Sequence, residues 1–110
     1  MASSESFSLH TLAARVKERA QASPEDSYTR KLIDRGIAHC AKKLGEEAIE
    51  TAIAAIAEDR ERVIAEAADL LYHLLVVLEA RGIALAEVET ALAQRTGKTG
   101  LEEKAERPRE

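Results

Sequence analysis

Two long segments with helical periodicity, residues 37–57 and 60–80, most constrain what this chain can fold into. Apolar residues recur at helical spacing along both segments, and only a short polar turn at 58–60 separates them. Asp59 is a favoured helix N-cap, so the second helix is expected to begin directly after it and to end near Gly82. Because the turn is short, the two helices are predicted to form an antiparallel hairpin.

Further helices are predicted on both sides of this hairpin. Ser6 or Ser8 can cap a first helix, whose apolar residues follow helical spacing. The stretch Ser23-Pro24-Glu25-Asp26 predicts the start of a second helix, with a cap, a proline and acids in the first turn. Gly36 is expected to bend or break that helix. A last helix is predicted over residues 85–97.

The composition agrees with an all-α fold. Hydrophobic residues make up 45% of the 110 residues, aromatic residues only 3%, and the chain has five Gly and two Pro. A core built mostly from Ala and Leu in a chain of this size is thin, so self-association is expected. We therefore predict an antiparallel bundle of four to five helices, completed by dimerisation. The predicted domain spans residues 7–97, between a flexible N-terminus at 1–6 and a charged C-terminal tail at 98–110.

The charge and the apolar pattern exclude some classes of protein. A net charge of −4 argues against a general nucleic-acid binder, which usually has a basic patch. The longest apolar run, residues 67–78, is too short to span a membrane, and Asp69 and His73 interrupt it. No signal peptide is evident, so a cytoplasmic protein is expected. Cys40 is the only cysteine and is expected to be a small buried residue.

Five acidic residues flank the predicted turn: Glu46, Glu47 and Glu50 precede it, and Glu66 and Asp69 follow it. Glu47/Glu50 and Glu66/Asp69 are both spaced i, i+3, so each pair shares one face of its helix. At a rise of 1.5 Å per residue, Glu50 lies ~13 Å from the turn, between Glu66 at ~10 Å and Asp69 at ~15 Å on the other helix. Glu47 lies about one turn further out. The hairpin would therefore bring four carboxylates to similar heights.

Carboxylates gathered in this way indicate a site for a hard divalent cation. Asp69 lies in the most apolar run of the chain, where a buried carboxylate is costly without a positive partner. Oxygen ligands suit Mg²⁺ or Mn²⁺ rather than zinc, and Mg²⁺ often joins carboxylates to substrate phosphates. A di-iron site would need Glu-x-x-His pairs, and no histidine of this chain has a Glu three residues earlier. The alternative is an acidic helix face exposed to solvent.

Two further side chains near the acids, Lys43 and His73, each have more than one plausible role. Lys43 lies about one turn before Glu46 and Glu47, where it could contact a phosphate or form an ordinary surface ion pair. His73 is four residues after Asp69. It could hydrogen-bond to Asp69, pack at a dimer contact, or be a buried core residue, which is the commoner case.

Two stretches of the sequence are similar to one known enzyme family: Lys43-Leu44-Gly45-Glu46-Glu47-Ala48-x-Glu50 and Glu66-Ala67-Ala68-Asp69-Leu70-Leu71-Tyr72-His73. They resemble phosphoribosyl-ATP pyrophosphatase, a member of the all-α NTP pyrophosphatase (MazG-like) superfamily. The four-acid pattern marks the superfamily. The Ser-Tyr-Thr segment at 27–29, the Asp-Leu-Leu-Tyr-His run at 69–73 and the Gly-Leu-Glu-Glu-Lys stretch at 100–104 mark this branch.

The resemblance implies hydrolysis of phosphoribosyl-ATP to phosphoribosyl-AMP and pyrophosphate, the second step of histidine biosynthesis. It also implies a homodimer with the active site near the subunit interface. The implied cofactor is Mg²⁺, for which Mn²⁺ could substitute. The residues that it assigns to the metal are Glu47, Glu50, Glu66 and Asp69. Glu46 would help to bind the metal or orient the attacking water, so the expected catalytic residues are Glu46, Glu47 and Glu50. Lys43 would stabilise phosphate charge, and the weaker candidates for the substrate pocket are Ser27, Thr29 and Arg30.

Two other functions remain open at this point. The first is a related house-cleaning enzyme that hydrolyses free or damaged nucleoside triphosphates, which only the branch-specific segments argue against. The second is a non-catalytic helical dimer or adaptor, in which the acids are a solvated face. That protein would have no Mg²⁺-dependent activity, and neutralising Glu50 or Asp69 would leave it unchanged or more stable.

Overall fold

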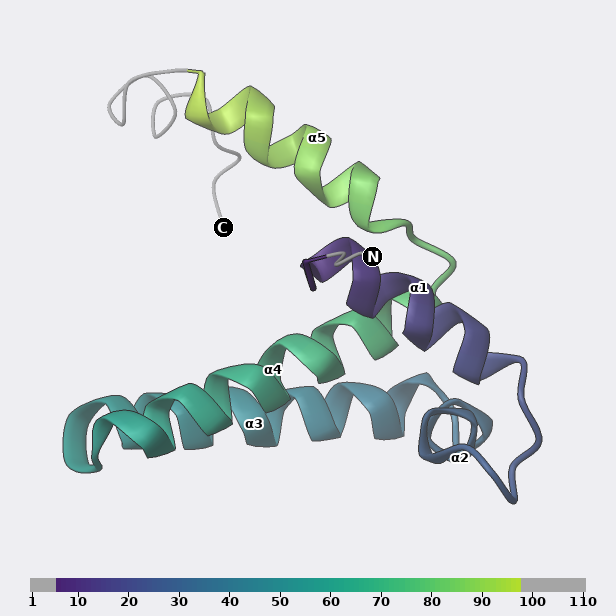
Figure 1. The fold of residues 1–110 in the computed structure, drawn as a ribbon, viewed down its shortest axis with the longest axis horizontal. Coiled ribbons are helices and arrows are strands. Elements are labelled where there is room, and N and C mark those ends of the chain that lie inside the picture. The colour runs from purple at the N-terminus through teal and green to yellow at the C-terminus, as the bar shows by residue number, and fades with distance from the viewer. Residues whose placement is uncertain (1–5, 98–110) are drawn as a thin grey trace.

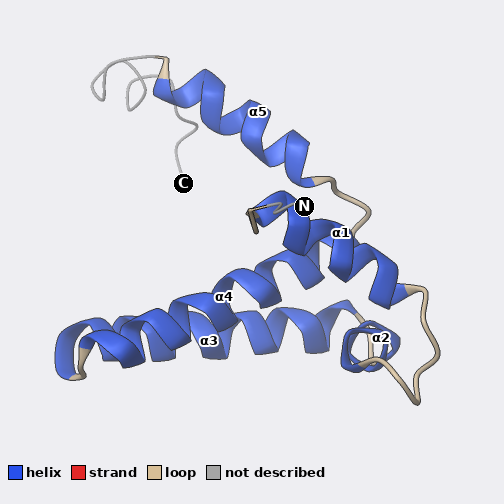
Figure 2. Ribbon diagram, viewed as in Figure 1, coloured by secondary structure: helices blue, strands red, loops and turns tan. Residues whose placement is uncertain are grey.

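The structure is a computed structural model that describes residues 6–97, and these residues form five α-helices joined by loops, with no strand among them (Figures 1 and 2). The helices are α1 (Leu9–Ala20), α2 (Tyr28–Asp34), α3 (Ile37–Ala57), α4 (Arg60–Ala80) and α5 (Leu85–Thr96). The predicted all-α class is confirmed. The predicted tail at 98–110 and all but the last residue of the predicted N-terminal segment lie outside the described residues. None of the described helices is long and apolar enough to cross a membrane.

The antiparallel hairpin of α3 and α4 is the main structural unit (Figure 1). Asp59 caps α4 as predicted, because its Oδ1 accepts a hydrogen bond of 2.9 Å from the backbone N–H of Arg62. Gly82 follows α4 with a φ of 69°, a conformation that favours glycine. The two long helices therefore begin and end where the sequence predicted.

The predicted start of the second helix at residues 23–26 is wrong. Residues 24–26 form a turn, and α2 begins only at Tyr28. Ser27 is the actual cap: its buried Oγ accepts from the N–H of Arg30 at 3.0 Å and donates to the backbone O of Arg19 at 2.8 Å. Ser23 lacks such tertiary support and bonds only within its own turn. Gly36, with a φ of 101°, then separates α2 from α3, which confirms the predicted break.

The hydrophobic core lies at one end of the hairpin, where α1 and α2 pack against the start of α3 and the second half of α4 (Figure 1). Its fully buried members include Val16, Leu32, Cys40 and Val76, one from each of these helices. Thr29 Oγ1 and Tyr72 Oη, 2.6 Å apart, join α2 to α4 beside this core. Among the described residues, no other helix packs against the part of the hairpin near the turn (Figure 1).

The described chain is extended for its size. Its radius of gyration is 16.4 Å, against about 13 Å for a compact domain of about 100 residues. Helix α5 has no buried residue and extends away from α1 and α4 (Figure 1), although His10 Nε2 on α1 lies 2.8 Å from an oxygen of Glu89 on α5. A single copy thus leaves much apolar surface uncovered.

Candidate metal centre

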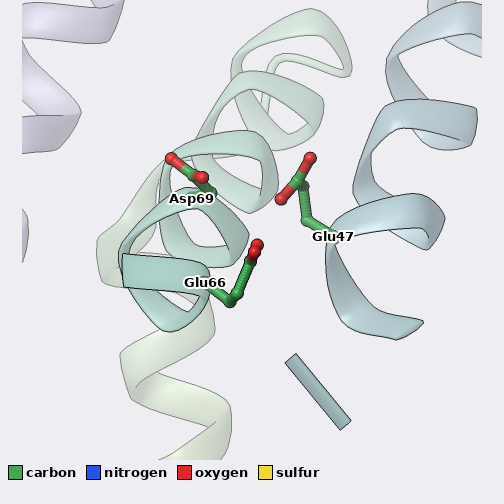
Figure 3. A group of neighbouring side chains, drawn as sticks. All are labelled: Glu47, Glu66 and Asp69. Carbon is green, nitrogen blue, oxygen red and sulfur yellow. The ribbon is translucent and has the colours of Figure 1, made fainter. Parts of the chain in front are cut away.

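Three acidic side chains from the two hairpin helices converge near the middle of the hairpin (Figure 3). Glu47 projects from α3 toward Glu66 and Asp69 on α4, and one carboxylate oxygen from each lies within 4.8 Å of the others. Glu66 is buried, Glu47 half-buried and Asp69 exposed. The hairpin therefore brings together three of the four acids that the sequence assigned to a metal.

Helical geometry explains why Glu50 is not in this group. The α4-facing side of α3 contains Glu47, Thr51 and Ala54, spaced i, i+4 and i+7, and Ala54 is fully buried. Glu50, three residues after Glu47, is rotated from it by roughly 60° about the helix axis and is exposed. Glu50 still lies close enough to Glu47 for charge repulsion to act between them. Its predicted role as a ligand stays a prediction.

Two carboxylate oxygens of the group lack a protein partner. Oε1 of Glu47 and Oε1 of Glu66 are buried, and neither has a hydrogen-bond partner within residues 6–97. The other oxygen of Glu66 pairs with the guanidinium of Arg62 at 3.2 Å. Two unit charges about 5 Å apart repel by roughly 3 kcal/mol at the effective dielectric near a protein surface. Buried oxygens without a partner from two of the acids, together with the exposed carboxylate of Asp69, fit Mg²⁺ or Mn²⁺, which prefer oxygen ligands.

The electrostatics of Glu47 point the same way. Desolvation raises the pKa of its carboxyl above the usual 4.5, and repulsion from Glu50 and Asp69 raises it further. A carboxyl in this state gains from a nearby cation, because the cation favours the ionised form.

Lys43 and Glu46 form an ion pair beside the three acids. The ammonium of Lys43 lies 3.4 Å from Glu46, and a hydrogen bond and attraction to that carboxylate raise the pKa of the lysine. The half-buried Glu46 also has Lys42 at 4.0 Å. Lys43 thus lies within electrostatic reach of Glu47 and keeps its charge, as a phosphate-binding lysine requires.

His73 is buried one turn after Asp69. It does not form the hydrogen bond to Asp69 that was one of its three predicted roles. Its Nδ1 is buried without a hydrogen-bond partner in the described part of the chain. Burial lowers the pKa of the imidazole, and the nearby charge of Lys43 lowers it further. The ring packs edge to face with Tyr72, at a centroid distance of 5.0 Å.

The three weaker substrate candidates all have partners within the fold. Ser27 is the buried cap of α2, and Thr29 is buried against Tyr72. Arg30 bonds Asp34 at 2.9 Å and the backbone O of Ala22 at 2.9 Å. These contacts show that all three side chains stabilise the fold. Their role in substrate binding stays a prediction.

Two residues that contact the acids, Thr51 and Arg62, were not among the predicted site residues. Thr51 Oγ1 reaches the backbone of both Glu47 and Glu66, and Arg62 pairs with Glu66. Each is four residues from an acid of the group, so the i, i+4 rule could have identified both as neighbours.

A family model described as phosphoribosyl-ATP pyrophosphohydrolase matches residues 9–96, which include every helix of the structure. The chain belongs to the phosphoribosyl-ATP pyrophosphohydrolase family. The match contains both hairpin helices and all five acids.

Curated relatives agree with this assignment to the phosphoribosyl-ATP pyrophosphohydrolase family. The chain is 62% identical over 101 residues to phosphoribosyl-ATP pyrophosphatase 1 of Bradyrhizobium diazoefficiens, covering 92% of this chain and 95% of the relative. It is 59% identical over 104 residues to the protein of the same name from Rhodopseudomonas palustris, covering 94% and 97%. It is 58% identical over 102 residues to phosphoribosyl-ATP pyrophosphatase of Agrobacterium fabrum, covering 93% and 95%.

Proposed function

We propose that this enzyme hydrolyses phosphoribosyl-ATP to phosphoribosyl-AMP and pyrophosphate, the second step of histidine biosynthesis, with Mg²⁺ as its cofactor. The family assignment and the names of the relatives support the reaction. The observation that most supports the cofactor is the convergence of Glu47, Glu66 and Asp69, with two buried oxygens that have no partner in the described residues.

The three converging acids would hold the cation, and Glu50 would join them from the exposed side of α3. A divalent ion bound there would neutralise the polyphosphate and activate water. No protein nucleophile is required, which agrees with the burial of Cys40 in the core.

Glu46 and Lys43 would act on water and phosphate. Glu46 lies outside the converging group, and it would orient the attacking water or accept its proton once Lys43 has moved away. The ammonium of Lys43 would move from Glu46 to a phosphate oxygen of the substrate, a change that costs little at a partly exposed ion pair. Water would cleave the bond between the α- and β-phosphates, because the products are a monophosphate and pyrophosphate.

Pyrophosphate release tests this proposal. Phosphoribosyl-ATP, ATP and deoxynucleoside triphosphates are compared as substrates, with and without Mg²⁺. We expect the highest kcat/KM for phosphoribosyl-ATP and no turnover in EDTA. Glu66→Gln should abolish turnover, whereas the matched control Glu61→Gln, an exposed acid on the same helix, should not. A higher kcat/KM for free nucleoside triphosphates would favour the house-cleaning function, and absence of any activity would favour the adaptor.

We further propose that the enzyme is a homodimer in which a second copy covers the hairpin. Four isoleucines near the turn are exposed by 51–88%: Ile49, Ile53, Ile56 and Ile64. Ile49, Ile53 and Ile56 are spaced i, i+4 and i+7, so they share one face of α3. Exposed apolar residues gathered on one face are typical of an interaction site, and the extended shape of one copy supports the same conclusion. Light scattering should give the mass of two chains, and Ile53→Lys should give one. A monomeric wild-type protein would refute the dimer.

A further inference from the structure

One hydroxyl outside the acidic pattern connects the two helices at the candidate metal centre. Thr51 lies on α3 one turn after Glu47, and its Oγ1 is 2.7 Å from the backbone O of Glu47. The same oxygen is 3.1 Å from the backbone O of Glu66, on α4. Both acceptors therefore belong to residues of the converging acid group.

Only the first of these contacts is common. Threonine in a helix often donates to the carbonyl four residues earlier, and such a bond affects its own helix alone. The contact with Glu66 joins residues on different helices and requires their backbones to approach closely. Ala54, the next residue of this face, is fully buried and small enough to allow that approach.

We propose that Thr51 is a positioning residue, whose hydroxyl sets the spacing of the Glu47 and Glu66 backbones and thereby the spacing of their carboxylates. The hydroxyl has one proton to donate, so the two carbonyls share it. The two carbonyls belong to residues whose carboxylates have oxygens within 4.8 Å of each other. A change in the local separation of α3 and α4 therefore changes the separation of the carboxylates.

The inference rests on the proposed metal centre, where small errors of ligand spacing reduce affinity. Outer contacts that orient metal ligands typically change affinity by about 10- to 100-fold when they are removed. Mg²⁺ demands near-ideal octahedral geometry at about 2.0–2.1 Å, so it is sensitive to such spacing.

Three variants separate positioning from simple packing. Thr51→Val keeps the shape and removes the hydroxyl, and Thr51→Ser keeps the hydroxyl and removes a methyl. Thr90→Val is the matched control: Thr90 Oγ1 makes the same local bond, 3.0 Å to the backbone O of Ala86, on exposed α5. If Thr51→Val does not fold, Thr51→Ala replaces it in the comparison with Thr51→Ser.

The primary measurement is Mn²⁺ affinity in the absence of substrate, followed by the electron paramagnetic resonance of free Mn²⁺. We expect Thr51→Val to bind about tenfold more weakly than the wild type, and Thr51→Ser and Thr90→Val to bind within about twofold of it. In activity assays Thr51→Val should need more Mg²⁺ for half-maximal rate, with little change in the KM for phosphoribosyl-ATP. In the metal-free protein, amide hydrogen exchange near residues 47–51 and 66–70 should accelerate in Thr51→Val only.

The outcomes distinguish this inference from the proposed function. Wild-type affinity in Thr51→Val would overturn the positioning role while leaving the metal centre intact. Equal weakening in Thr51→Val and Thr51→Ser would show that any change of packing at this position weakens binding, whether or not the hydroxyl is present, and would also overturn it. A wild-type protein that binds no Mn²⁺ would refute the metal centre itself, and the inference with it.

Discussion

Glu47 on α3 and Glu66 on α4 face each other across the hairpin, each with a buried Oε1 atom that has no hydrogen-bond partner within residues 6–97. Asp69 completes the group, with all three ligand atoms within 4.8 Å (Figure 3). A fold that places like charges so close together and leaves two of their buried oxygens without a partner is less stable in the metal-free state than it could be.

Neutralising Asp69 should separate catalysis from folding. Asp69→Asn removes one charge from the acid group, so we expect turnover of phosphoribosyl-ATP to fall at least ~100-fold, as for loss of a transition-state charge contact. Because Asp69 is exposed, the free energy of unfolding in EDTA should stay within about 0.5 kcal/mol of the wild type or increase. Urea denaturation and circular dichroism measure the second effect. Glu50→Gln should behave in the same way, and unchanged turnover in both variants would support a solvated acidic face.

The stability of the metal-free protein should depend on the protonation of Glu47. Desolvation and the charges of Glu50 and Asp69 raise the pKa of this carboxyl above 4.5 in the folded protein. The folded state therefore holds this proton more tightly than the unfolded chain does, so the free energy of unfolding falls as pH rises from 4.5 through the raised pKa. Denaturation in EDTA over a pH series measures this slope. Glu47→Gln should flatten it, Glu61→Gln should not, and an unaltered slope in Glu47→Gln would contradict the assignment.

The contact between Thr29 and Tyr72 should contribute to stability rather than to substrate binding. Tyr72→Phe removes the phenolic hydroxyl, keeps the ring, and leaves the buried Thr29 hydroxyl without its partner at 2.6 Å. An unsatisfied buried group costs about 1–3 kcal/mol, which thermal or urea unfolding would detect. Tyr28→Phe is the control, because Tyr28 is 57% exposed. A raised KM for phosphoribosyl-ATP with unchanged stability would instead place Thr29 in the substrate pocket.

The thiol of Cys40 should be unreactive in the folded protein. Burial raises its pKa, and the Sγ atom donates to the backbone O of Leu32 at 3.3 Å. Reaction with a thiol reagent should therefore require opening of the core, and should be more than about 100-fold slower in the native protein than in guanidinium chloride. A double variant, Cys40→Ala with Ala38→Cys, moves the thiol to an exposed position of α3 and should react rapidly. Rapid native reaction of Cys40 itself would show that this part of the core opens easily.

The fold could be predicted from the sequence where strong local signals coincide. The hairpin has regular apolar spacing, an Asp cap and a glycine stop, and its helices match the predicted bounds. The second helix was misplaced because Ser23-Pro24 and Ser27 are both plausible caps. The choice depends on a tertiary contact, the bond from Ser27 to the backbone of Arg19, which local sequence does not reveal.

The candidate site was predicted in part for a similar reason. The distance of each acid from the turn predicted that four acids lie at similar heights. Which of them face one another also depends on the rotation of each helix about its axis, and this rotation turns Glu50 outward. Thr51 was missed because its contact with Glu66 depends on how closely α3 and α4 approach. The spacing of residues along the sequence does not reveal that distance.

The location of the cation tests the central claim most directly. Crystals grown with Mn²⁺ and measured near the manganese absorption edge would place any bound ion by its anomalous scattering. We predict a peak about 2.0–2.2 Å from oxygens of Glu47, Glu66 and Asp69, and its loss in Glu66→Gln. A peak elsewhere, or none at these three acids in an active enzyme, would contradict the account.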